Sequence, residues 1–199
     1  MLHRRTPNFT VNVCRETNAG GLRGYEMDVE HCRFNGDGLV RLRSTVMMST
    51  DAAGALPYDP IRGSVLLVEQ LRLGTLLASR KAAGLEPYTL EIPAGIVEAG
   101  EDPVQVAARE LFEETGCRAR KVEFVARYLA DPVQSANIFS LFAMEVDAGE
   151  HRELAGMEQG EDLRVRELSR ADFLEMLDGH ALQDAATIIA AQWLRAHRT

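Results

Sequence analysis

Residues 95–117 read GIVEAGEDPVQVAARELFEETGC. This stretch predicts one helix with clear boundaries. Asp102 fits the N-cap position, Pro103 fits the first helical position, and Gly116 fits the position just after the last turn. Between them, Val104–Thr115 consists of residues with good helix propensity. We therefore expect a single capped helix in the middle of the chain.

The expected helix carries three carboxylates on one face, because Glu110, Glu113 and Glu114 are spaced i, i+3 and i+4. Acidic side chains in the last turn of a helix oppose its dipole. A hard divalent cation such as Mg²⁺, which prefers carboxylate oxygens, would explain this arrangement. A solvated acidic helix face is the other explanation, and the three residues alone leave both open.

The full spacing resembles the Nudix box, G-x5-E-x7-R-E-U-x-E-E-x-G-U, in which U is aliphatic. Gly95, Glu101 and Arg109 stand at the required distances, and the remaining fixed residues follow in residues 110–116. Cys117 replaces the last aliphatic residue, which is a mild change because a free cysteine behaves as a small hydrophobe. The stretch is thus similar to the catalytic motif of the Nudix hydrolases.

The similarity extends over residues 34–197. Residues 59–62, 65–72 and 91–98 resemble the ADP-ribose pyrophosphatase branch of this family, as do residues 160–165 and 184–194. The resemblance implies an α+β architecture, the Nudix fold, in which a mixed β-sheet lies between helices. It also implies a small N-terminal β subdomain over residues 1–50, which helps to form a homodimer, and a Nudix hydrolase domain over residues 51–199.

The resemblance assigns roles to individual residues. It implies Mg²⁺ as the cofactor, for which Mn²⁺ can substitute. The implied metal ligands are the Ala94 carbonyl, Glu110, Glu114 and Glu161. The implied catalytic residues are Glu113, Arg109, which orients the glutamates, and Glu158 as general base. The implied substrate contacts are Arg72, Arg43, Ile96 and Pro132. From its own position, Arg72 is equally well explained as a surface charge at a strand end.

The sequence differs from the ADP-ribose pyrophosphatase branch at positions that bind the substrate and at the position of the general base. Gln159 stands at the position of the general base and cannot accept a proton, so Glu158 is expected to replace it. Residues 131–137 lack the usual glycines, and Asn137 stands where a carboxylate is expected. Ser44 replaces a substrate-binding arginine, although Arg43 is adjacent.

The expected reaction is therefore Mg²⁺-dependent hydrolysis of a nucleoside diphosphate linked to another group. For ADP-ribose as the substrate, the products would be AMP and ribose 5-phosphate. The departures keep two alternatives open. One is a pyrophosphatase for GDP-mannose or another nucleotide sugar, and the other is a Nudix-type ligand sensor without catalytic activity.

Composition limits the remaining classes. The chain has 199 residues and a net charge of −8, which argues against a nucleic-acid-binding surface. Its apolar stretches are shorter than the roughly 18 residues of a membrane span, and no secretory signal is visible. The three cysteines form neither a metal pair nor a disulfide framework. We expect a cytoplasmic protein that binds neither nucleic acid nor membrane.

The pattern of apolar residues predicts the other elements. Strands are expected over residues 8–14, 39–48, 64–71, 88–92, 122–129, 138–146 and 163–168. Two further helices are expected over residues 169–177 and 182–196, and a loop over residues 76–87. Strands mixed with a few helices in this order again indicate an α+β fold.

Overall fold

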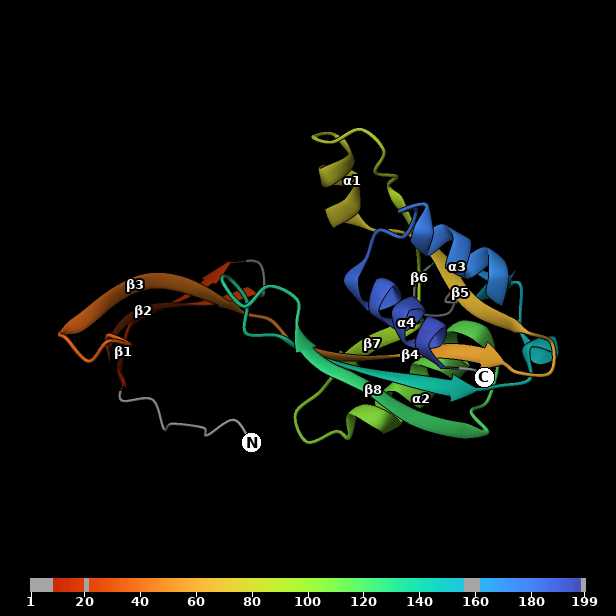
Figure 1. Cartoon of the computed structure of the whole chain (residues 1–199), viewed down its shortest axis with the longest axis horizontal. Helices are drawn as coiled ribbons and strands as arrows, with labels where there is room; N and C mark the ends of the chain where they lie inside the picture. The colour runs from red at the N-terminus through yellow and green to blue at the C-terminus, as the bar shows by residue number, and fades with distance from the viewer. Residues whose placement is uncertain (1–8, 20–21, 156–161, 198–199) are drawn as a thin grey trace. The chain divides into compact units, whose positions relative to one another are not determined.

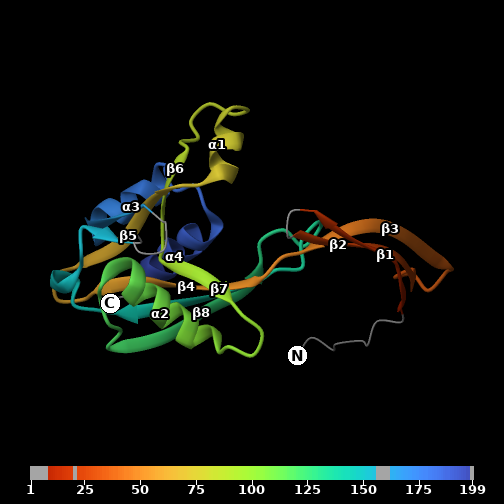
Figure 2. The same cartoon turned by 180° about the vertical axis from the view of Figure 1, so that it is seen from behind.

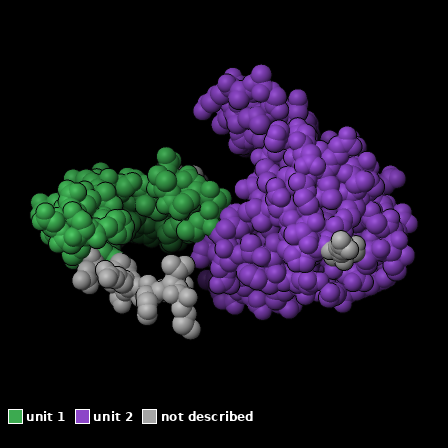
Figure 3. Space-filling model, viewed as in Figure 1, with its two compact units in different colours: residues 1–50, 129–137 green, residues 51–128, 138–199 purple. Residues whose placement is uncertain are grey.

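The computed structural model describes residues 9–19, 22–155 and 162–197. The chain divides into two compact units, which Figure 3 shows in green and purple. Unit 1 contains residues 1–50 and 129–137, and unit 2 contains residues 51–128 and 138–199. Within the described ranges, no helix is both long enough and apolar enough to cross a membrane.

Unit 1 is built on a three-stranded antiparallel sheet with the order β1-β2-β3. Its strands are β1 (Phe9–Ala19), β2 (Leu22–Cys32) and β3 (Leu39–Met48). The segment that belongs to this unit from the second half of the chain joins the end of β3. There, Met47 N–H donates to the Gln134 carbonyl (2.7 Å), and Ala136 N–H donates to the Met47 carbonyl (3.1 Å).

The sheet of unit 1 has two different faces, because alternate residues of a strand point to opposite sides. Strand pairing aligns Val11 with Val29 and Val29 with Leu42, so these apolar residues share one face. The same pairing aligns Asp28 with Arg43 on the opposite face, where ion pairs predominate. The sheet is therefore amphipathic.

Unit 2 contains a mixed sheet. Its strands among the described residues are β4 (Asp51–Asp59), β5 (Ser64–Leu71), β6 (Tyr88–Glu91), β7 (Ala94–Val97), β8 (Lys121–Leu129), β9 (Ile138–Glu145), β10 (Leu154–Ala155) and β11 (Leu163–Ser169). The main order is β10-β11-β5-β4-β9-β8, with β6 paired to β5 and β7 paired to β4. Strand β4 runs parallel to β9 and antiparallel to β5 and β7, which makes the sheet mixed.

Helices cover both faces of this sheet (Figures 1 and 2). Helix α2 (Pro103–Thr115) packs on one face, where Leu111 joins a core with Leu66 and Met144. Helices α3 (Arg170–Asp178) and α4 (Ala185–Ala196) pack on the other, where Phe173 joins a second core with Leu67. A short helix, α1 (Leu73–Ser79), follows β5, and a 3-10 turn spans Ala148–Glu150. The predicted α+β fold, a mixed sheet between helices, is confirmed.

Several predicted boundaries were wrong. The first strand continues to Ala19, with an irregularity in its pairing between Val13 and Arg15. Part of the expected loop over residues 76–87 belongs to α1. The last helix begins at Ala185 and not at residue 182, because the Asp184 side chain accepts the Thr187 N–H at 3.0 Å and caps the helix there.

Three strands were not predicted: β2, β4 and β7. Strand β4 (DAAGALPYD) is poor in β-forming residues and contains a proline. It is extended because β5, β7 and β9 all pair with it and because Ala53–Asp59 is buried. Tertiary contacts thus override local propensity in this segment.

Candidate active site

Helix α2 has the boundaries that its sequence predicts. The Asp102 side chain accepts the Val104 N–H (3.1 Å), and Pro103 occupies the first turn. Gly116 ends the helix in the left-handed conformation, with φ of 82°, which glycine adopts without strain. Cys117 is fully buried in the core beside α2, as expected for a residue that replaces an aliphatic side chain.

A pocket of about 670 Å³ lies beside α2 within unit 2. Both acidic and basic side chains line it, together with main chain of the β7 strand. The lining residues are Ala52, Arg72, Ala94, Gly95, Ile96, Glu98, Glu101, Arg109, Glu110, Glu113, Glu114 and Phe139. Five of these twelve residues are glutamates, so a phosphate-bearing ligand would need cations to enter the pocket.

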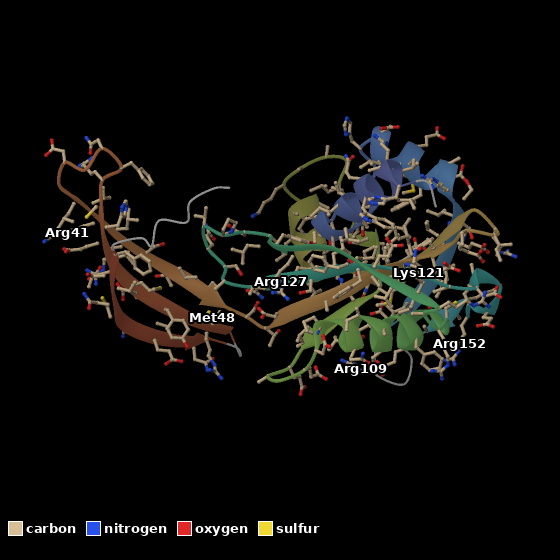
Figure 4. The ribbon with its side chains drawn as sticks, turned by 60° about the horizontal axis from the view of Figure 1, so that its bottom comes forward. Arg41, Met48, Arg109, Lys121, Arg127 and Arg152 are labelled. Carbon is tan, nitrogen blue, oxygen red and sulfur yellow. The ribbon has the colours of Figure 1, made fainter. Side chains whose placement is uncertain are left out.

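Arg109 holds two of the glutamates (Figure 4 labels this arginine). Its Nη1 atom lies 2.7 Å from Glu110 Oε1 and 3.3 Å from Glu113 Oε2. Glu114 lies deeper, at 6% exposure. Glu101 is held in the preceding loop, where its carboxylate accepts the Glu98 N–H at 2.9 Å. One guanidinium therefore orients two of the five glutamates that line the pocket.

Gly95 brings the main chain of β7 against α2. Strand pairing of Gly95 with Ala53 and of Ala94 with Gly54 places β7 along β4, next to the helix. A β-carbon at residue 95 would overlap the Glu110 carboxylate. A side chain at residue 95 would therefore displace the Glu110 carboxylate, which explains the glycine at the start of the motif.

Arg72, the residue that follows β5, also lines the pocket. Its Nε donates to Glu91 Oε1 at 2.7 Å, and Gln70 Nε2 donates to the same oxygen at 2.6 Å. Burial raises the pKa of Glu91, although the hydrogen bonds and charge of Arg72 act in the opposite direction.

The donor chemistry of the pocket fits a hard divalent cation, because carboxylate oxygens and main-chain carbonyls are the ligands of Mg²⁺. The room that Gly95 leaves for Glu110 also fits such a site. In the part of the chain that the structure describes, no three acidic, histidine or cysteine side chains converge closely enough to hold a metal ion. The pocket therefore offers the kinds of oxygen ligand that Mg²⁺ prefers, but its described side chains are not already arranged around a metal position.

The structure brings together most, but not all, of the residues that the sequence singles out. Seven of them line this pocket: Arg72, Ala94, Ile96, Arg109, Glu110, Glu113 and Glu114. Arg43 and Pro132 belong to unit 1 and are not among the described residues that line it. Arg43 pairs there with Glu26 (3.1 Å) and Asp28 (3.5 Å). Glu158 and Glu161 lie outside the described residues.

Sequence reasoning missed two buried polar residues behind the pocket. Gln70 and Glu91, each 8% exposed, hold Arg72. The signal was a glutamine or glutamate near the end of a predicted strand, namely Gln70 in SVLLVEQL and Glu91 in YTLE. A buried polar side chain in such a strand needs a partner, which here is the arginine at the pocket.

Comparisons with known proteins agree with this arrangement. The family model of the NUDIX domain matches residues 48–191. The ADP-ribose pyrophosphatase of Escherichia coli (strain K12) is 33% identical over 189 residues, which cover 93% of this chain and 87% of that protein. The ADP-ribose pyrophosphatase of Haemophilus influenzae is 32% identical over 145 residues, covering 72% and 66%.

This chain is also similar to a protein that is named for a substrate other than ADP-ribose. The GDP-mannose pyrophosphatase of Pectobacterium atrosepticum is 29% identical over 171 residues, which cover 86% of this chain and 84% of that protein. The domain match and the two relatives above 30% identity agree with the complete box and the acidic pocket around α2. The chain therefore belongs to the Nudix hydrolase superfamily, in the ADP-ribose pyrophosphatase branch, and is a Nudix pyrophosphohydrolase.

Proposed function

We propose that this protein hydrolyses ADP-ribose to AMP and ribose 5-phosphate with the help of Mg²⁺. The observation that carries the proposal is the pocket itself, which is lined both by the glutamates of α2 and by Arg72. Cations bound by the glutamates and the guanidinium of Arg72 would together neutralise a pyrophosphate group. Two relatives at 32–33% identity that carry this activity in their names support ADP-ribose as the substrate.

The proposed metal ligands are Glu110, Glu114, the Ala94 carbonyl and Glu161, of which the last lies outside the described residues. A bound Mg²⁺, or Mn²⁺ in its place, would supply Lewis acidity and would make a bound water molecule more acidic than free water. Arg109 orients Glu110 and Glu113 through its guanidinium. Glu113 is then available as a further ligand or as a partner of a metal-bound water.

The remaining roles concern the proton and the substrate. We assign the general base to Glu158, which the described residues do not include, because Gln159 cannot accept a proton. Arg72 binds the phosphates or the terminal ribose from within the pocket, and Ile96, which is 55% exposed, offers an apolar contact at its edge. Substrate contacts from Arg43 and Pro132 remain a prediction from the family resemblance.

A substrate panel tests the proposal. The protein is incubated with Mg²⁺ and ADP-ribose, nucleotide sugars, dinucleoside polyphosphates, NADH or nucleoside triphosphates, and the products are identified by chromatography. We expect AMP and ribose 5-phosphate from ADP-ribose, no turnover with EDTA, and recovery on addition of Mg²⁺. Preferential hydrolysis of a nucleoside triphosphate would contradict the proposal.

GDP-mannose is the second candidate substrate, because a relative of that name matches 86% of the chain. Residue 137 also differs from the carboxylate expected for ADP-ribose. The Asn137 side chain donates to the Thr50 carbonyl at 2.7 Å and also contacts Ser49, so it supports the main chain of unit 1. Release of GMP and mannose 1-phosphate at a higher kcat/KM than AMP release would establish this alternative.

We also propose that the protein is a homodimer formed through unit 1. Phe9, Val11 and Leu42 on the apolar face of its sheet have relative exposures of 54%, 40% and 52%. A three-stranded sheet is stable when its hydrophobic face is covered. The same face of a second copy of the chain could cover it, because in the two-fold interfaces of most homodimers the same surface of both subunits is in contact.

A cytoplasmic location stays a prediction. It is supported by the three cysteines, Cys14, Cys32 and Cys117, none of which forms a disulfide. Unpaired thiols are the rule in reducing compartments.

A further inference from the structure

Glu91 is a buried carboxylate that the proposed reaction does not use. It ends strand β6 at 8% exposure, opposite Val68 of β5. Its Oε1 atom accepts hydrogen bonds from Gln70 Nε2 (2.6 Å) and Arg72 Nε (2.7 Å), and it lies 2.6 Å from Arg72 Nη2. Three donor atoms thus converge on one carboxylate oxygen.

Stability alone does not explain this arrangement. Burying an ion pair removes both charges from water, and apolar residues of similar volume often serve a fold equally well or better. The residue paired with Glu91 in the sheet is Val68, which is fully buried, so an apolar residue 91 would suit the core on this side. A buried glutamate at residue 91 is explained if its role is to fix the orientation of the Arg72 guanidinium.

The orientation of Arg72 is fixed at both the main chain and the side chain. Its N–H donates to the Pro87 carbonyl (3.2 Å), and its carbonyl accepts from Leu76 N–H (2.9 Å). The guanidinium edge formed by Nε and Nη2 faces Glu91. The other edge, which carries Nη1, has no hydrogen-bond partner within the described residues and belongs to a side chain that lines the pocket.

The main chain next to Glu91 is anchored as well. The Ile92 N–H donates at 3.0 Å to Oγ1 of Thr187, a residue of α4 with 0% exposure. This hydrogen bond holds the main chain that follows Glu91, so the carboxylate that contacts Arg72 extends from an anchored strand.

We propose that Glu91 is a positioning residue for the substrate: together with Gln70 it holds Arg72 so that the free edge of the guanidinium faces the pocket. This edge offers two parallel N–H donors, which match the oxygens of a phosphate group. Glu91 itself does not touch the substrate. The inference rests on the proposed function, because it takes Arg72 as a contact of the pyrophosphate.

A double-mutant cycle tests whether Glu91 acts through Arg72. Arg72→Ala should raise KM for ADP-ribose about 10- to 100-fold, the value of a charged hydrogen bond, with a smaller change in kcat. Glu91→Gln keeps the shape but removes the charge, and it should raise KM about tenfold. In the Arg72→Ala background, Glu91→Gln should have no further effect. Independent effects that multiply, or an unchanged KM in Glu91→Gln, would overturn the proposal.

Glu167→Gln is the matched control. Glu167 holds Arg62 in the same way, at 2.8 Å from Nε, but neither residue lines the pocket. This variant should leave KM for ADP-ribose within about twofold of the wild type, well below the tenfold change expected for Glu91. A KM increase equal to that of Glu91→Gln would mean that loss of any such pair disturbs the site, which contradicts a specific role.

A measurement without turnover separates this inference from the proposed function. The ¹⁵Nε–¹Hε resonance of Arg72, assigned by its absence in Arg72→Lys, should be protected from exchange in the wild type and lose protection in Glu91→Gln. Equal protection in both proteins would overturn the positioning role, whatever the substrate is. If protection is lost but the wild type hydrolyses no nucleotide of the panel, the proposed function fails while the Glu91–Arg72 coupling stands.

Discussion

Gly95 of β7 lies against the carboxylate of Glu110 on α2, so closely that a β-carbon at residue 95 would overlap it. The two residues come from different elements and are brought together by the pairing of β7 with β4. This contact joins the main chain beside Ala94 to the acidic face of the helix, and it brings the proposed main-chain and side-chain ligands into one pocket.

We expect Gly95→Ala to lower activity strongly without unfolding the protein. The added methyl group displaces the end of the flexible Glu110 side chain, which can move at little cost to stability. Displacement of a proposed ligand by about 1 Å should lower kcat/KM about 100-fold. Kinetics with Mg²⁺ and thermal unfolding measure the two effects. Gly74→Ala is the control, since open space surrounds that residue; near wild-type activity of Gly95→Ala would contradict this reading of the site.

Glu114→Gln should lower kcat by more than about 100-fold, because the loss of even an outer partner of a metal ligand costs roughly 10- to 100-fold. The amide retains the shape of the buried side chain, so circular dichroism and the unfolding midpoint should stay close to those of the wild type. Glu175→Gln, at an exposed position of α3, provides the control. Full Mg²⁺-dependent activity of Glu114→Gln would show that the metal-site assignment is wrong.

The carboxylate of Asp59 should make stability depend on pH. It accepts the N–H groups of Ile61 (2.9 Å), Arg62 (3.0 Å) and Ala148 (3.0 Å). Burial acts to raise the pKa of Asp59, but these N–H donors outweigh it and hold the pKa below 3.8. The ionised form is therefore the stabilising one.

Its contribution should be complete above pH 3.8, the ordinary value, and disappear as the pH falls towards the lower folded-state pKa. Asp59→Asn should thus lower the free energy of unfolding at pH 7 by roughly 1–3 kcal/mol. Urea unfolding at pH 7 and at successively lower pH measures the difference from the wild type. A difference that stays constant or grows below pH 3.8 would be inconsistent with the hydrogen-bonded carboxylate.

Leu42→Glu should convert the proposed dimer into monomers, because it places a charge in the middle of the apolar face of unit 1. Analytical ultracentrifugation should show a halved mass. Thr45→Lys is the control: Thr45 lies on the charged face beside Glu26, where a cation is tolerated. A wild-type protein that sediments as a monomer would refute the proposed assembly directly.

The sequence predicted the helix of the site well, because its signals are local. Asp102, Pro103 and Gly116 act within one or two turns of their own positions, and the structure confirms all three. The spacing along that helix also suffices to place Glu110, Glu113 and Glu114 on one side of it. Strand β5 was predicted for a similar reason, since SVLLVEQL is apolar and bounded by Gly63.

Two of the strands that were not predicted, β2 and β4, were missed for different reasons. Strand β2 alternates between Tyr25, Met27 and Val29 on one face and acidic residues on the other, a pattern that is visible in the sequence but was overlooked. Strand β4 has no such pattern, and it is extended only because β5, β7 and β9 surround it.

The sequence by itself determined the family, the capped helix and the kind of chemistry, because these depend on residue types at fixed spacings along one segment. Only the tertiary structure decided that Gly95 meets Glu110 and that Glu91 holds Arg72. Such contacts join residues 15 and 19 positions apart across strands and a helix. They arise from strand pairing and burial, which depend on how the whole sheet assembles and which no local pattern encodes.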